Sequence, residues 1–154
     1  MGVDEAYNFR RVDDRITTSG LLSEEQLRAL GGEGYDAVVD LLPADNEWAV
    51  AGEAAIVGAQ GLDYVPIPVD FDAPTHADLE RFVEVMDALD GRTVHVHCAA
   101  NYRVSAFYGL YALRTGRWTE AQADAFVSDL WDPSEHPVWA SFIADQRAAS
   151  GDPS

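Results

Sequence analysis

The chain of 154 residues has a single cysteine, Cys98, and no lysine. One cysteine excludes any disulfide bond within the chain. No apolar run approaches the length of about 18 residues that a membrane helix needs. The first ten residues, MGVDEAYNFR, also lack the apolar region of a signal peptide. We therefore expect a cytoplasmic protein that does not insert into membranes.

Basic residues are scarce: all ten are arginines, against 27 acidic residues, and the net charge is −17. An acidic surface repels nucleic acids and anionic membranes, so we expect no nucleic-acid partner. The same charge repels phosphate esters at long range. Local hydrogen-bond donors at a binding site can overcome this repulsion, especially where salt screens the distant charges.

Hydrophobic residues make up 47% of the chain and fall into alternating strand and helix patterns. The length is typical of one domain, and neither a repeat nor a linker interrupts residues 1–154. Ser23, Thr75 and Thr119 are expected helix caps. The patterns predict a short strand within 11–18, strands at 36–42, 64–69 and 93–97, and helices at 23–30, 46–59, 78–89, 104–113, 119–130 and 137–148. This alternation predicts a three-layer α/β fold, with helices on both faces of a mostly parallel sheet.

Cys98 lies where such a fold places its chemistry. It ends the strand at 93–97, and a helix follows within a few residues. Ligands of open α/β sheets bind beyond the carboxyl ends of the strands. The backbone N–H groups of Ala99, Ala100, Asn101 and Tyr102, together with the helix dipole, would bind an anion there. The same field favours the thiolate, which is the nucleophilic form of cysteine.

Arg103 follows this loop, and its planar guanidinium can bind two oxygens of one phosphate. The leaving oxygen of a phosphate ester also needs a proton, for which Asp70 and Asp72 are the candidate acids. These groups predict a phosphomonoester hydrolase that needs no metal or organic cofactor. Zinc normally needs three or four ligands. We expect His95 and His97 to share one face of the sheet, without enough partners for a metal site.

Several segments match known phosphatases. They are Ile16-Thr-Thr-Ser-Gly20, Leu22 to Leu30, Ile67-Pro-Val-Asp70 and Val96-His-Cys-Ala-Ala-Asn-Tyr-Arg-Val-Ser-Ala-Phe107. With them the chain resembles the cysteine-based protein tyrosine phosphatase superfamily, in its small dual-specificity-like branch. It is more closely similar to a bacterial phosphatase-like family, some members of which are fused to metallo-β-lactamase-fold hydrolases. The resemblance extends over roughly residues 10–115.

The resemblance implies a role for each matching residue. Cys98 would attack phosphorus to form a cysteinyl-phosphate, and Arg103 would hold the equatorial oxygens. His97 would orient the loop and favour the thiolate. Ser105 would assist release of the phosphate from sulfur. Asp70, which directly follows Ile67-Pro-Val69 as in the bacterial family, would protonate the leaving oxygen, with Asp72 as the alternative acid.

The loop departs from the family pattern in one respect. Four residues separate Cys98 from Arg103, where the superfamily has one residue more, and the usual loop glycines are missing. A shorter loop also fits a rhodanese-like sulfurtransferase that carries sulfur as a Cys98 persulfide. A third alternative is a phosphate-binding module without turnover. For the phosphatase, the sequence leaves a phosphoprotein, a phosphoinositide and a small phosphate ester open as substrates.

Overall fold

The computed structural model describes residues 2–150. Within them, five strands form one sheet in the order β1-β2-β5-β3-β4. The strands are β1 (Arg10–Arg11), β2 (Ile16–Ser19), β3 (Ala37–Asp40), β4 (Asp63–Pro66) and β5 (Val94–His97). β2, β5, β3 and β4 run parallel, and only β1 pairs antiparallel, with β2. The mostly parallel sheet predicted from the sequence is thus confirmed, and β5 lies at its centre.

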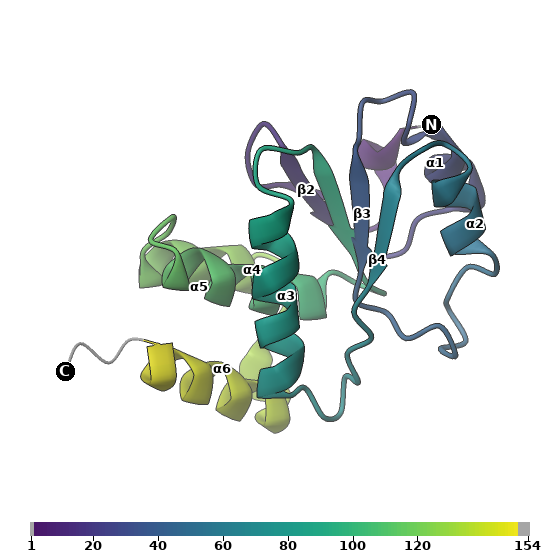
Figure 1. The fold of residues 1–154 in the computed structure, drawn as a ribbon. Helices are drawn as coiled ribbons and strands as arrows, with labels where there is room; N and C mark the ends of the chain where they lie inside the picture. Colours follow the sequence, from purple (N-terminus) through teal and green to yellow (C-terminus); the bar gives the residue numbers. More distant parts are fainter. Residues whose placement is uncertain (1, 151–154) are drawn as a thin grey trace.

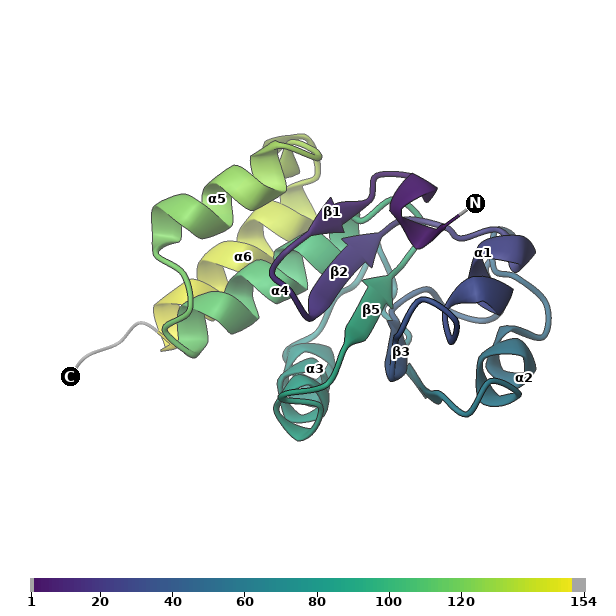
Figure 2. The ribbon, with the colours of Figure 1, turned by 90° about the horizontal axis from the view of Figure 1, so that it is seen from above.

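Helices cover both faces of the sheet (Figures 1 and 2). One face carries α1 (Glu24–Ala29) and α2 (Glu53–Gly58). The other carries α3 (His76–Ala88), α4 (Tyr102–Arg114), α5 (Glu120–Ser128) and α6 (Pro137–Ser150). Two short 3-10 helices, η1 (Val3–Glu5) and η2 (Pro133–Glu135), complete the described elements. None of the helices within residues 2–150 is long and apolar enough to cross a membrane.

Side chains of β5 alternate between two cores, as a strand requires. Val94, Val96 and the following Cys98 belong to the larger core, which α3 and α4 cover. His95 and His97 lie on the opposite face, and their rings stack with centroids 6.2 Å apart. The predicted shared face of the two histidines is therefore confirmed. His97 therefore lies on the face of the sheet that α2 covers.

Three of the helices begin at capping boxes. The hydroxyls of Ser23, Thr75 and Thr119 each accept the backbone N–H three residues later, where a side chain reaches back to the cap. These contacts satisfy N–H groups that a helix start otherwise leaves unpaired. The three caps predicted from the sequence are confirmed.

Two expected elements differ from the structure. The short strand expected within residues 11–18 is present as β2, but the additional strand β1 precedes it in a hairpin, because the Asp13 carboxylate accepts the N–H groups of Arg15 and Ile16 and turns the chain. The predicted helix at 46–59 is wrong for its first half, and only α2 forms. Asn46 accepts the Trp48 N–H in a local turn, and Gly52 has a left-handed φ of 76°. These turns compete with a helix before Glu53.

Gly20 lies directly beneath the loop that follows β5. It forms an isolated antiparallel bridge with Ala100, and the Leu21 N–H donates to the Ala99 carbonyl at 3.0 Å. A Cβ on Gly20 would lie 2.5 Å from the Ala99 oxygen and 2.9 Å from the Ala100 Cα. Both are backbone atoms and cannot rotate away. Only glycine therefore lets the chain pack at this distance against residues 98–101, the cysteine loop.

Gly20→Ala should therefore lower the free energy of unfolding by about 1–3 kcal/mol, the usual cost of overpacking. Urea denaturation measures this change. The matched control is Gly58→Ala in α2, where a Cβ meets no atom within 4 Å. The control should be neutral or stabilising by up to about 1 kcal/mol, because alanine restricts the unfolded chain. Equal effects of the two substitutions would contradict the contact.

Candidate active site

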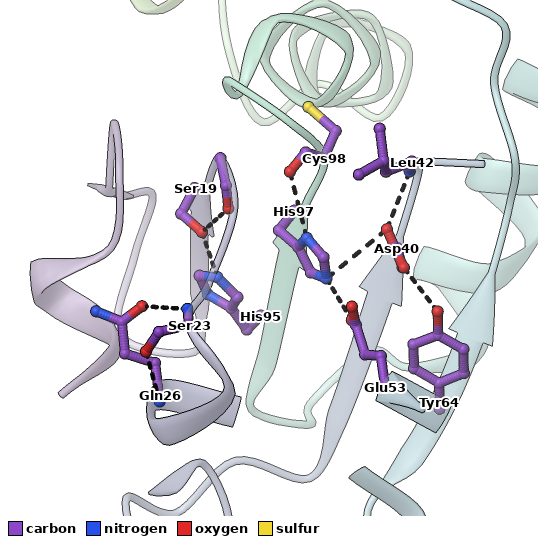
Figure 3. A network of polar contacts seen from close by, with 11 residues as sticks. Ser19, Ser23, Gln26, Asp40, Leu42, Glu53, Tyr64, His95, His97 and Cys98 are labelled. Carbon is purple, nitrogen blue, oxygen red and sulfur yellow. Dashed lines mark hydrogen bonds and ion pairs between the residues drawn. The ribbon is translucent and has the colours of Figure 1, made fainter. Parts of the chain in front are cut away.

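Cys98 follows the last residue of β5, the strand between β2 and β3 (Figure 3). It is fully buried. Its N–H donates to the Ser19 carbonyl at 3.3 Å. The next two residues, Ala99 and Ala100, donate their backbone N–H groups to no acceptor within the described part of the chain. The cysteine thus ends the central strand, and free backbone donors follow it directly.

Asn101 joins this loop to α4. It has a left-handed φ of 68°, which asparagine tolerates better than most residues, and its side chain does not cap the helix. Instead, its Nδ2 donates to the Asn8 carbonyl and the Thr18 hydroxyl, both at 2.9 Å. The start of α4, unlike the capped starts of α1, α3 and α5, therefore keeps its N–H groups free of a side-chain cap.

Arg103 connects the cysteine loop to the segment after β4. Its side chain is buried, and its Nε–H donates to the Val69 carbonyl at 2.9 Å. The guanidinium carbon lies 5.2 Å from the centroid of the Phe71 ring. With Nε engaged in this way, the two terminal nitrogens of the guanidinium have no hydrogen-bond partner within the described part of the chain, so they can accommodate a ligand.

Arg103 lines a cavity of about 480 Å³. The other lining residues are Pro43, Asp45, Asn46, Pro68, Asp70, Phe71 and Asp72. The structure thus brings the predicted arginine and both candidate acids to one cavity. Cys98 is not among the lining residues. The Asp70 carboxylate also accepts the Asp72 N–H at 2.9 Å, so it shapes the turn that presents both acids.

Ser105 and Tyr102 are engaged in packing. The Ser105 hydroxyl donates to the Tyr102 carbonyl and accepts the indole N–H of Trp131, both at 3.0 Å. The Tyr102 ring stacks on Trp131 with centroids 4.7 Å apart. Neither side chain lines the Arg103 cavity. The first turn of α4 is therefore fixed in place by the segment around Trp131.

His97 is held by two carboxylates that sequence reasoning missed. Its Nε2 lies 2.5 Å from Glu53 and 3.7 Å from Asp40, and all three side chains are buried (Figure 3). Burial alone lowers the pKa of His97, but the charge of Asp40 and the hydrogen bond with Glu53 outweigh it and raise the pKa to about 9. The sequence pattern indicates a buried role for Asp40, because it is the one carboxylate inside the apolar run 37–42. No such pattern marks Glu53.

These three residues also form the one group of His, Cys, Asp or Glu side chains within residues 2–150 whose ligand atoms lie close enough together for a metal, within 4.8 Å. Their geometry is that of an ion pair. The 2.5 Å separation between His97 and Glu53 is a hydrogen-bond distance, and both Asp40 oxygens already accept, from the Leu42 N–H and the Tyr64 hydroxyl. A proton on the His97 ring satisfies the carboxylate oxygens of this cluster.

Comparison with known proteins bears on this site. A family model described as a DSP-PTPase phosphatase fused to NAD+ kinase matches residues 4–135. The chain is also similar to the crystal structure of a DUF442 candidate phosphatase from Shewanella putrefaciens CN-32. The two are 34% identical with a TM-score of 0.87, over 97% of each chain.

More distant similarities agree with these. A β-lactamase hydrolase-like protein from Agrobacterium fabrum is 28% identical over 75% of this chain, which spans 27% of that protein's length. TpbA from P. aeruginosa, in complex with phosphotyrosine, is 16% identical with a TM-score of 0.70 and covers 94% of this chain and 91% of its own, which shows a shared fold. The chain belongs to the DSP-PTPase family described as fused to NAD+ kinase, within the cysteine-based protein tyrosine phosphatase superfamily.

Proposed function

We propose that the protein hydrolyses phosphomonoesters through a cysteinyl-phosphate on Cys98. The observation that carries the proposal is the buried Arg103, which is fixed to the Val69 carbonyl and lines one cavity with Asp70 and Asp72. Arg103, five residues after the single cysteine, thus lies in the same cavity as the two acids that could protonate a leaving group. Membership of the phosphatase family supports the same chemistry.

In the first step, the Cys98 thiolate attacks phosphorus and the bond from phosphorus to the leaving oxygen breaks. The terminal nitrogens of Arg103 and the N–H groups of Ala99 and Ala100 stabilise the equatorial oxygens. Asp70 gives its proton to the leaving oxygen. Because Cys98 has no exposed surface, the cysteine loop or the cavity wall has to move as the ester binds.

In the second step, a water molecule attacks the cysteinyl-phosphate. The Asp70 carboxylate takes a proton from this water, the sulfur–phosphorus bond breaks, and phosphate leaves with the thiolate restored. In the proposed role of Ser105, the hydroxyl proton that faces the Tyr102 carbonyl turns to the departing sulfur. Asp72 is the alternative acid.

The cavity favours some phosphate esters over others. Three aspartates, Asp45, Asp70 and Asp72, line the cavity together with a single basic residue, Arg103. Additional negative charge on the substrate would meet these carboxylates, whereas a neutral or cationic organic group would not. Among the three substrate classes, this ranks a phosphoprotein or a small phosphate ester above a phosphoinositide with several phosphates.

Cys98→Ser should abolish vanadate-sensitive hydrolysis of an aryl phosphate, because a serine hydroxyl is not ionised at neutral pH. The mutant should keep the wild-type circular dichroism spectrum. Transfer of sulfur from thiosulfate to cyanide, assayed on the same preparation, should be negligible. That reaction needs no general acid, so it would leave Asp70 without a role.

The mutant protein is the blank for both assays. Strong sulfur transfer that disappears in the blank, without any release of phosphate, would replace the proposal with a sulfurtransferase. Tight binding of phosphate without any turnover would favour the non-catalytic module.

Asp70→Asn should slow hydrolysis of an alkyl phosphate by about 10²–10⁴-fold, the usual contribution of a general acid. An aryl phosphate with a good leaving group should be affected much less, since that group departs without a proton. The amide oxygen of asparagine can still accept the Asp72 N–H, so the turn is retained. Asp72→Asn is the matched control. If only the control showed the dependence on the leaving group, Asp72 would be the acid.

A further inference from the structure

Three chain segments meet at the ring of His97 (Figure 3). Its Nδ1 lies 3.4 Å from the carbonyl oxygen of Cys98, in the cysteine loop. Its Nε2 faces Asp40, the last residue of β3, and Glu53, the first residue of α2. All of the facing atoms are oxygens that only accept hydrogen bonds once the carboxylates are ionised.

Both nitrogens therefore need a proton. A neutral imidazole has a single N–H and would leave a lone pair against either the Cys98 carbonyl or the carboxylates. His95 provides the contrast, because its nitrogens face the hydroxyls of Thr17 and Ser19, which can donate or accept. Burial accordingly lowers the pKa of His95 well below its usual value, whereas the pKa of His97 is about 9.

Asp40 and Glu53 flank one wall of the Arg103 cavity. The chain between them, 41–52, contributes Pro43, Asp45 and Asn46 to the cavity lining. Asp40 has further donors, the Leu42 N–H at 2.9 Å and the Tyr64 hydroxyl at 2.6 Å. For Glu53, the side-chain partner within the described residues is His97. The far end of this wall is therefore anchored by the imidazolium.

We propose that Asp40 and Glu53 are positioning residues that keep His97 doubly protonated, and that this imidazolium holds the cysteine loop and the cavity wall in one arrangement. The inference rests on the proposed function, because one of these two segments has to move when an ester reaches the buried Cys98. When His97 loses its proton, the contact to Cys98 or the contact to Glu53 is lost, and the two segments loosen together.

The pH dependence has a definite sign. Because folding raises the pKa of His97, its charge stabilises the fold fully below the unfolded value of about 6.5. That contribution is lost as the pH rises through about 9. The groups that face the ring are Asp40 on β3, Glu53 on α2, Cys98 after β5 and the neutral His95 ring. Burial and the nearby Asp40 raise the pKa of Tyr64, so this hydroxyl stays protonated over the same range.

NMR titration of the whole chain from pH 6 to 10 tests the proposal without any substrate. The His97 ring, in histidine-labelled protein, should titrate near pH 9. The backbone amides of 44–52 and 98–101 should shift with the same midpoint. In Glu53→Gln, which removes one charge and keeps the shape, all three midpoints should fall together by at least one pH unit. The control Glu84→Gln removes the same charge from an exposed position on α3 and should change none of them.

Separate midpoints for the two segments, or segments that do not respond when His97 titrates, would overturn the coupling. An unchanged His97 midpoint in Glu53→Gln would overturn the role of Glu53. The wild-type titration decides the coupling even if this variant does not fold. If the protein did not hydrolyse phosphate esters, the proposed function would be wrong, but the titrations would still test the coupling of the two segments through His97.

Discussion

The hydrogen bond from the Arg103 Nε to the Val69 carbonyl joins the two halves of the candidate site. Arg103 belongs to the helix that follows the cysteine loop, and Val69 to the segment that carries both candidate acids. Together with the Phe71 ring, this contact fixes the direction of the guanidinium relative to the segment that carries the acids. The bond also explains why an arginine is suited to the position, since its terminal nitrogens stay free while Nε is engaged.

Most of the charge around this contact is negative. The protein as a whole has a net charge of −17, and three aspartates line the cavity with one arginine. Behind the cysteine loop, on the other face of the sheet, the buried His97 offsets part of the negative charge of Asp40 and Glu53. In the proposed mechanism, an incoming phosphate would therefore be attracted only where Arg103 and the loop N–H groups act at short range, which would favour a substrate with one phosphate group.

Local patterns in the sequence were sufficient for much of the fold. The capping residues, the apolar strands and the strand–cysteine–helix order depend on neighbours a few positions apart, so they could be read directly. The helix expected at 46–59 was wrong in its first half because the turn at Asn46 and the left-handed Gly52 outweigh a weak helical pattern. Glu53 could not be assigned, because its buried partner lies 44 residues away. The close packing of Gly20 against Ala99 is likewise a contact of the folded chain alone.

A crystal structure of the protein with bound tungstate would test the central claim most directly, because tungstate has the shape and charge of the transferred phosphate. The proposed mechanism predicts tungsten above the Cys98 sulfur, with two oxygens on the terminal nitrogens of Arg103 and another on the N–H groups of Ala99 or Ala100. The cysteine loop or the cavity wall at 41–52 should have moved to expose the sulfur. Tungstate bound to Arg103 in the cavity, with Cys98 still covered, would contradict a cysteinyl-phosphate mechanism.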